Sequence, residues 1–445
     1  MKLKLLTIFY LLRYSLRRLP ASREALDVWQ ERRIGKFVKQ MAQRAPFYAA
    51  KVAQYGDWRA FPPINKALFM EHFNEINTCG IDREQAMEVA MNAESGRDFS
   101  PTLNGITVGL STGTSGNRGL FLASTKERAQ WVAAIFLKVL KPWRWRRQVK
   151  VAFFLRANSN LYNAVESKVV QFQFYDLLRP VSALLADLAL FQPDVIVAQP
   201  SMLLLVAGAV EAKTLRIQPG RIISVAEVLD PETEARLTQI FQQQIHQVYQ
   251  CTEGFLACTC DEGTLHVNED FVKIEPHWID EEKTRFQPII TDFTRTSQPV
   301  IRYLLNDVLV ARQTPCPCGS PFMALERIEG RMDDVFLLLD RQGRERTVFA
   351  DFIRRAVVRA SEGILEYQVI QTSYSKLLVQ VELSAERNLE LVNKAIFSSF
   401  EQMVKELDIS PISLEIVEGI PPLGANKLRR IRRDFTLDNA SQNDT

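Results

Sequence analysis

The residues best suited to chemistry in this sequence lie in one segment rich in hydroxyls and glycines. In order, the segment comprises Ser111, Thr112, Gly113, Thr114, Ser115, Gly116, Asn117, Arg118 and Gly119. Glycines let the backbone turn several amides toward one ligand, and the hydroxyls and the arginine add donors and positive charge. This combination suits a polyphosphate. The segment is not the common P-loop, because no Gly-Lys-Ser/Thr follows at the required distance. The alternative is a flexible surface loop of the same composition.

A second group of candidate residues combines thiols with an imidazole. Cys260, His266, Cys316 and Cys318 offer three thiolates and one imidazole, a set that closes a tetrahedral zinc site of the structural kind. The proline between Cys316 and Cys318 suits two ligands on one turn. Cys258 is an alternative to Cys260. The simpler alternative is that these cysteines bind no metal and pack as small apolar side chains.

Composition excludes several classes of protein. The chain has 445 residues, 47% hydrophobic and 24% charged, which is an ordinary globular composition with material for about three domain-sized units at roughly 150 residues each. A net charge of +3 argues against a protein whose main task is to neutralise nucleic-acid phosphates. Six cysteines are too few for a disulfide scaffold, so we expect a reducing, cytoplasmic location.

The first 18 residues combine an apolar run with basic residues. Leu5 to Leu12 is too short to span a bilayer, and the arginines that follow it, with no clear cleavage site, differ from a signal peptide. We therefore expect this segment to be retained. The favoured interpretation is a helix that packs on the body of the protein. The alternative is a basic amphipathic helix in peripheral contact with an anionic membrane.

Hydrophobic periodicity predicts an α/β protein with a large and a small domain. A helix is expected over Glu31 to Arg44, because Ile34, Phe37, Val38 and Met41 share one face. Buried strands are expected at 149–155, 195–198, 221–225 and 247–249, alternating with helices such as 232–244, which indicates a parallel sheet. Residues 264–312 alternate between apolar and polar and predict antiparallel strands.

The last hundred or so residues predict a separate small α+β domain. Strands are expected at 367–371, 377–383 and 412–416, around a helix that carries Leu389, Val392, Ile396, Phe400, Met403 and Leu407 on one face. We place the domains at 1–332 and 333–445. The polar tail 438–445 is expected to be disordered.

Five segments in order resemble motifs of the adenylate-forming superfamily. The first is the hydroxyl- and glycine-rich segment, which resembles the phosphate loop. Residues 249–253 (Tyr-Gln-Cys-Thr-Glu) are similar to the family's Tyr-Gly-x-Thr-Glu, and 291–307 resemble the segment that ends in a ribose-binding aspartate. Residues 327–334 match Gly-Arg-x-Asp-Asp, and 424–430 resemble the loop that carries a catalytic lysine.

The resemblance implies a role for each matched position. The residues implied to bind ATP phosphates are Ser111, Thr112, Gly113, Thr114, Ser115, Gly116 and Arg118. Tyr249 would stack on adenine, Thr252 would contact phosphate, and Glu253 would hold Mg²⁺. Asp307 and Arg331 would bind the nucleotide, Asp333 would be the hinge before a mobile C-terminal domain, and Lys427 would be catalytic. Attack of a carboxylate on ATP brings two anions together, so an ammonium acting as a point charge suits that step.

Within the superfamily the sequence most resembles the phenylacetate-CoA ligases and coenzyme F synthetases. The stretches that carry this are 224–227 with 230–232, the Cys-Pro-Cys-Gly of 316–319, and 23–48 at the start of the chain. The resemblance places Glu227 among the nucleotide-binding residues and implies the zinc described above. It also implies an adenylate-forming enzyme that acts on an aromatic or apolar carboxylic acid.

The expected reaction is formation of an acyl-adenylate from ATP with release of pyrophosphate, followed by transfer to CoA. Residues 335–346 depart from the family pattern, so an amine, a hydroxyl or a carrier protein stays open as the acceptor. The alternative to an enzyme is a catalytically silent scaffold that binds nucleotide. The presence of both Glu253 and Lys427 argues against this alternative. The sequence does not determine the oligomeric state, and a homodimer is one of the alternatives.

Overall fold

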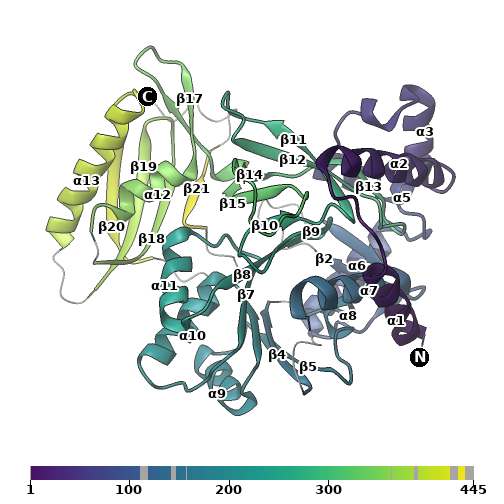
Figure 1. Ribbon diagram of the computed structural model, residues 1–445. Coiled ribbons are helices and arrows are strands. Elements are labelled where there is room, and N and C mark those ends of the chain that lie inside the picture. Colours follow the sequence, from purple (N-terminus) through teal and green to yellow (C-terminus); the bar gives the residue numbers. More distant parts are fainter. Residues whose placement is uncertain are drawn as a thin grey trace. The chain divides into compact units, whose positions relative to one another are not determined.

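The computed structural model describes residues 2–110, 119–141, 147–156, 158–361, 363–384, 389–420 and 429–435 (Figure 1). The chain divides into two compact units. Unit 1 comprises residues 1–305 and 309–328, and unit 2 comprises 306–308 and 329–445. The main boundary between the units therefore lies between Ile328 and Glu329. The domains proposed from the sequence meet four residues later, between Met332 and Asp333.

Unit 1 begins with a helical region. Its helices are α1 (Lys2–Ser15), α2 (Arg23–Ala42), α3 (Pro46–Tyr55), α4 (Lys66–Glu71), α5 (Phe73–Ile76) and α6 (Arg83–Gly96). The expected helix at Glu31 to Arg44 is the second half of α2, which starts earlier because the Ser22 hydroxyl caps it by accepting a hydrogen bond from Ala25 N. The predicted stripe of Ile34, Phe37, Val38 and Met41 is buried in a core cluster. A small antiparallel sheet follows, with β1 (Thr102–Leu103), β2 (Ile106–Leu110) and β3 (Leu120–Ala123).

Five parallel strands form one part of the large sheet, and four of them were predicted from buried apolar runs. They are β4 (Val149–Leu155), β5 (Val170–Asp176), β6 (Val195–Ala198), β7 (Arg221–Val225) and β8 (Ile245–Cys251), in the order β8-β7-β6-β4-β5. On one face pack α9 (Val181–Phe191), α10 (Pro200–Glu211) and α11 (Pro231–Phe241), and on the other pack α7 (Thr125–Ile135) and η2 (Phe136–Leu140) (Figure 1). The sequence missed β5, which lies at the edge of the sheet and alternates with polar residues.

The sheet continues through antiparallel strands, and those within 264–312 were predicted from the alternation of apolar and polar residues. These are β9 (Gly254–Thr259), β10 (Leu265–Val267), β11 (Val272–Trp278), β12 (Arg285–Asp292), β13 (Val300–Leu304), β14 (Asp307–Ala311) and β15 (Ala324–Arg331). The hairpin β8–β9 joins the parallel and antiparallel parts. Its connection holds Thr252 and Glu253, so this corner is fixed by strands on both sides.

Unit 2 is the small α+β domain that the sequence predicted. A sheet of order β20-β19-β18-β21 consists of β18 (Ile364–Gln371), β19 (Lys376–Leu383), β20 (Ser413–Glu418) and β21 (Ile431–Arg433). Helix α13 (Leu389–Glu406) buries Val392, Ile396, Phe400 and Met403 in the core of this unit. A hairpin of β16 (Phe336–Leu339) and β17 (Glu345–Val348), followed by α12 (Ala350–Val358), was not expected. The mixed α/β class and the large and small parts confirm the predicted fold class.

Candidate functional site

Three predicted site residues lie where parallel strands of unit 1 end. Glu227 follows β7, and Thr252 and Glu253 follow β8. Arg156, which the sequence did not suggest, follows β4. In open parallel sheets ligands bind outside the carboxyl ends of the strands. Burial lowers the pKa of Arg156, and the carboxylate of Glu227 acts in the opposite direction, so this pair of opposite charges lies at the same edge. Glu227 also accepts a hydrogen bond of 3.3 Å from Ser201 N, in the first turn of α10.

The Thr252–Glu253 corner is held by its own side chains and by a buried neighbour. The Thr252 hydroxyl donates a hydrogen bond of 2.8 Å to Glu253 Oε2. The corner is tight at the next residue, because a Cβ on Gly254 would lie 3.2 Å from Asp292 Oδ2. Asp292 is buried, and burial raises its pKa although Thr294 donates to its carboxylate over 2.6 Å. The corner therefore presents one carboxylate, Glu253, beside a rigid backbone.

An arginine that the sequence analysis did not single out joins this corner to strand β3. Arg295 donates a hydrogen bond to the carbonyl of Thr252 and another, of 3.0 Å, to Gln298 Oε1. Gln298 in turn donates to Leu120 O over 3.0 Å and accepts from Leu122 N over 3.1 Å. Strand β3 directly follows the hydroxyl- and glycine-rich segment. A side-chain bracket of Arg295 and Gln298 thus connects the Thr252–Glu253 corner to the strand that follows the other predicted phosphate-contact segment.

A small recess in unit 1 opens at this bracket. Its polar lining comes from Lys66, Thr252, Glu253, Arg295 and Gln298, and Gly119 forms part of the wall. Two cationic side chains and one carboxylate therefore border the same space. Gly119 is the last residue of the hydroxyl- and glycine-rich segment, so the recess adjoins the end of that segment.

The bracket rests on a buried glutamate in α7. Glu127 Oε1 accepts hydrogen bonds from Thr296 N (2.6 Å) and Ser297 N (2.8 Å), and its Oε2 accepts from the hydroxyls of Ser124 and Ser297. Burial alone would raise the pKa of Glu127, but these donors outweigh it and the pKa is lowered. The ionised carboxylate thereby fixes the turn that carries Arg295 and Gln298.

The strand β8 that precedes the corner supplies two further side chains. Tyr249 is buried and packs in a core cluster with Leu256 and Ala257. Gln250 stands where the resembling motif has glycine, and its Oε1 accepts a hydrogen bond of 2.9 Å from the Trp131 indole. In this structure little of the Tyr249 ring is exposed to a ligand.

A second group of predicted residues is brought together in unit 2. Arg331 Nε lies 3.6 Å from Asp307 Oδ1, and Asn306 donates a hydrogen bond of 2.7 Å to Asp333 Oδ2. Asp333 is in a single turn, η4 (Met332–Asp334). Next to it, Asp334 is paired with Arg429, and burial raises the pKa of Asp334 although that arginine opposes the shift. Asp307 and Arg331 therefore form a pair, and Asp333 is joined to the residue that precedes Asp307.

Several predicted positions lie outside the described residues. These are Ser111, Thr112, Gly113, Thr114, Ser115, Gly116 and Arg118, the loop residues 424–428 with Lys427, and the C-terminal tail. Arg429 and Arg430, which follow Lys427, are described and are paired with Asp334 and Glu366, respectively.

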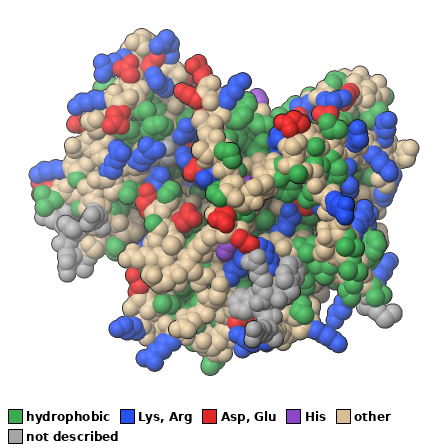
Figure 2. Space-filling view, in the orientation of Figure 1, with side chains coloured by type: hydrophobic (Ala, Val, Ile, Leu, Met, Phe, Trp, Pro, Cys, Tyr) green, Lys and Arg blue, Asp and Glu red, His purple; other side chains and the backbone are tan. Residues whose placement is uncertain are grey.

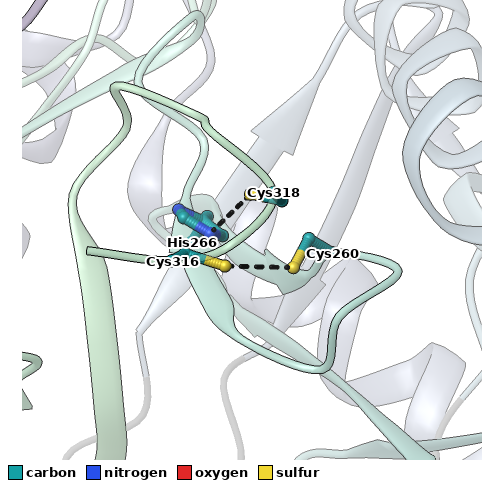
Figure 3. A group of neighbouring side chains, drawn as sticks. All are labelled: Cys260, His266, Cys316 and Cys318. Atoms are coloured by element: carbon teal, nitrogen blue, oxygen red, sulfur yellow. Dashed lines mark hydrogen bonds between the residues drawn. The ribbon is translucent and has the colours of Figure 1, made fainter. Parts of the chain in front are cut away.

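The predicted metal ligands converge. Figure 3 shows Cys260, His266, Cys316 and Cys318 pointing toward one another, and their ligand atoms all lie within 4.8 Å of one another. The Cys260 and Cys316 sulfurs are 3.8 Å apart, and Cys318 Sγ lies 3.4 Å from His266 Nε2. Zinc–sulfur bonds of about 2.3 Å at tetrahedral angles place two sulfurs about 3.8 Å apart, so the spacing fits zinc. Cys258 lies elsewhere, with its Sγ 3.5 Å from Asn268 Oδ1.

The surroundings of this cluster favour metal binding. His266 Nδ1 is 3.1 Å from the carbonyl of Phe322, which can only accept, so Nδ1 carries the proton and Nε2 keeps a lone pair toward the sulfurs. Burial opposes ionisation of the Cys316 thiol, but hydrogen bonds from the Thr264 side chain and the Cys318 amide outweigh it and lower its pKa to about 6. Gly319, at φ +72°, closes the Cys-Pro-Cys turn in a left-handed conformation.

The sequence suggests a substrate-pocket wall at Phe153, Phe154, Leu155 and the stretch Asn158 to Tyr162, with core packing as the alternative. Phe154 is fully buried and stacks on Tyr175 at 4.4 Å between ring centroids. Phe153 is on the other face of the sheet, where it contacts Tyr162 at 4.9 Å. These rings belong to the cores of the two faces.

Comparison with known proteins gives a likeness in structure alone. No family model matches the chain, and no curated protein matches it. A 2-hydroxyisobutyryl-CoA ligase, solved in its postadenylation state with an acyl-AMP, has a TM-score of 0.66 at 16% identity, over 92% of this chain and 89% of that one. An amide bond synthetase from Marinactinospora thermotolerans has a TM-score of 0.52 at 13% identity, over 73% and 68%. Fatty acyl-adenylate ligases from E. coli and L. pneumophila give 0.53 at 14% identity, over 72% and 68%. The chain thus shares the fold of adenylate-forming ligases.

Proposed function

We propose that this protein activates a carboxylic acid as an acyl-adenylate at the expense of ATP and then transfers the acyl group to an acceptor. The observation that carries the proposal is the bracket of Arg295 and Gln298, which joins the Thr252–Glu253 corner to the strand that follows the hydroxyl- and glycine-rich segment. By the sequence resemblance, the hydroxyl- and glycine-rich segment would hold the ATP phosphates, and the Thr252–Glu253 corner would hold phosphate and Mg²⁺. The fold shared with acyl-adenylate-forming ligases is the second support.

In the proposed first step, a carboxylate oxygen of the acid attacks the α-phosphorus of ATP. A new P–O bond forms, the bond to the β-phosphate oxygen breaks, and pyrophosphate leaves. Mg²⁺ held by Glu253 would supply positive charge to the phosphates. The Thr252 hydroxyl would turn its hydrogen from Glu253 to a phosphate oxygen, and Arg295 would keep the corner in place. Lys427 would add an ammonium near the transferred group, where negative charge is concentrated.

The acyl acceptor is proposed to be CoA, with amines, hydroxyls and carrier proteins as the alternatives. Neighbours in structure support both kinds of chemistry, because one is a CoA ligase and another an amide bond synthetase. The acid is proposed to be aromatic or apolar on the basis of the sequence resemblance. We propose Asp307 and Arg331 as nucleotide contacts, because they form a pair, and Asp333 as the hinge, on the basis of the sequence resemblance.

The decisive experiment measures pyrophosphate release from Mg-ATP with a panel of aryl, fatty and amino acids, using hydroxylamine as a surrogate acceptor. Release with one class of acid, lost in Glu253→Gln, is the expected result. Stimulation by CoA with formation of a thioester would identify CoA as the acceptor. If no acid in the panel supports release although ATP binds, the proposal is wrong and a silent nucleotide-binding scaffold becomes the better explanation.

We also propose a structural zinc at Cys260, His266, Cys316 and Cys318. It would fasten the hairpin of β9 and β10, which carries Cys260 and His266, to the loop before β15, which carries Cys316 and Cys318. A closed set of four ligands leaves no coordination position for substrate, so the metal would stabilise the fold. Metal analysis of the purified protein, expected to give one zinc per chain, tests this assignment.

A further inference from the structure

Helix α1 has two faces with different surroundings. Tyr10 is buried against Ala129 and Ala133 of α7, and Leu3, Leu6, Leu11 and Tyr14 pack around them. Tyr14 also contacts Phe271, with 5.1 Å between ring centroids. This face confirms the favoured expectation that the first segment packs on the body of the protein. Among the described residues, none buries the opposite face of α1 to the extent that α7 buries this face.

The outer face is a stripe of large apolar side chains. Leu5, Ile8, Phe9, Leu12 and Leu16 are exposed by 61, 55, 53, 59 and 79%, respectively. Their spacing of three and four residues places them on one side of the helix. Figure 2 shows hydrophobic and basic side chains gathered over the position of α1. We call these five residues the α1 stripe.

Basic residues border the α1 stripe, and acidic ones are absent from this part of the sequence. With about 100° of rotation per residue, Lys2 and Arg13 fall along one edge of the stripe and Lys4 along the other. No aspartate or glutamate occurs before Glu24. Arg33 of α2 lies near this segment: burial, and then the charges of Arg17 and Arg13, lower its pKa.

The orientation of α1 is fixed by an ion-pair network at its end. Arg17 pairs with the buried carboxylate of Asp270, which also binds Lys138 of η2 at 2.9 Å. The stripe therefore cannot turn inward without breaking a buried pair and the Tyr10 packing. Among the described residues, no helix has the length and apolar character needed to cross a bilayer.

We propose that the α1 stripe docks on an anionic membrane surface, with its apolar side chains in the interfacial region and Lys2, Lys4 and Arg13 at the lipid headgroups. This is the arrangement of an interfacial amphipathic helix, which combines a buried apolar face with attraction to anionic lipids. A second copy of the chain fits less well. Pairing two stripes would bring their basic borders together with no acidic residue of the segment to neutralise them.

The test is sedimentation of the full chain with vesicles of phosphatidylcholine alone and of phosphatidylcholine mixed with phosphatidylglycerol. We expect binding to the mixed vesicles at low ionic strength and weaker binding at high ionic strength. Lys4→Gln should weaken binding about fivefold, which corresponds to about 1 kcal/mol for one basic residue near the surface. Leu12→Glu should weaken it by roughly tenfold or more.

The matched control is Leu190→Glu, which changes an equally apolar residue of α9 that is 85% exposed. It should bind like the unchanged protein. Because Leu12 is exposed, Leu12→Glu should also keep its cooperative thermal unfolding, and Ile8→Gln provides a milder second variant. Absence of binding to mixed vesicles, or equal loss in Leu190→Glu, overturns the proposal. A lipid-free dimer that Leu12→Glu dissociates, without vesicle binding, would instead make the stripe an interface between copies.

Discussion

The guanidinium of Arg295 donates a hydrogen bond to the backbone carbonyl of Thr252, a residue 43 positions earlier in the chain. Through Gln298 the same guanidinium is joined to strand β3. Arg295 is therefore a positioning residue: it acts on the proposed ATP site by holding the Thr252–Glu253 corner at a set distance from the strand after the hydroxyl- and glycine-rich segment.

Arg295→Ala should raise the KM for Mg-ATP and lower kcat, with a combined loss in kcat/KM of about tenfold or more. A hydrogen bond to a charged group contributes about 1.5–3 kcal/mol, and 1.4 kcal/mol corresponds to a factor of ten. Arg295→Lys should restore only part of the activity, because an ammonium cannot reach both acceptors in the same geometry. Arg236→Ala, on the exposed surface of α11, is the control. Unchanged ATP kinetics in Arg295→Ala would show that the bracket does not serve the site.

Lys427→Ala should lower acyl-adenylate formation by about 10²–10³-fold, the size of effect that follows loss of one preorganised donor to the transition state. ATP binding should stay largely intact, since the proposed contact matters most while charge develops. The measurements are pyrophosphate release and equilibrium binding of ATP. Lys394→Ala, an exposed lysine of α13 paired with Glu390, removes the same charge from the same unit and should be silent. Equal activity of both variants with the unchanged protein would refute the role of Lys427.

Cys318→Ser should abolish stoichiometric zinc and lower the thermal midpoint of unfolding. The variant lacks one of the four proposed zinc ligands, and a structural zinc contributes directly to the stability of the fold. Element analysis and thermal unfolding with and without a chelator are the measurements. Cys79→Ser is the control, because Cys79 lies outside the cluster and its thiol donates a hydrogen bond to Ser297 O at 3.9 Å. Full zinc content in Cys318→Ser would contradict the assigned ligand set.

Glu127→Gln should destabilise the protein at neutral pH by about 1–3 kcal/mol, since an amide cannot accept all the hydrogen bonds that the buried carboxylate accepts. The pKa of Glu127 is lowered in the folded state, so its contribution is complete above the ordinary glutamate range near 4.3. That contribution is lost as the pH falls through this range toward the lowered pKa. The difference in free energy of unfolding between the two proteins should therefore shrink on acidification. Denaturant titrations at neutral and acid pH measure it, and a constant difference would contradict the assignment.

Much of the fold followed from local sequence patterns. Buried apolar runs identified β4, β6 and β7 because parallel strands covered on both faces are continuously hydrophobic. The edge strand β5 was missed because polar residues interrupt its apolar ones and only two of its seven residues are buried. The hairpin of β16 and β17 was missed because short strands carry little periodicity. Residue type and order along the chain were also enough to single out Thr252, Glu253 and the four zinc ligands as candidates.

By itself the sequence determined which residue types were present and in what order: a hydroxyl- and glycine-rich segment, a Thr-Glu pair, and a thiol and imidazole set. Only the tertiary structure decided which of these meet. It selected Cys260 over Cys258 because a turn after β9 carries Cys260 toward Cys316, a conformation that spacing does not specify. It assigned Phe154 to the core, and it brought Arg295, Gln298 and Glu127 to the candidate site. These contacts join residues distant in sequence, and such contacts depend on how the sheet and helices pack as a whole.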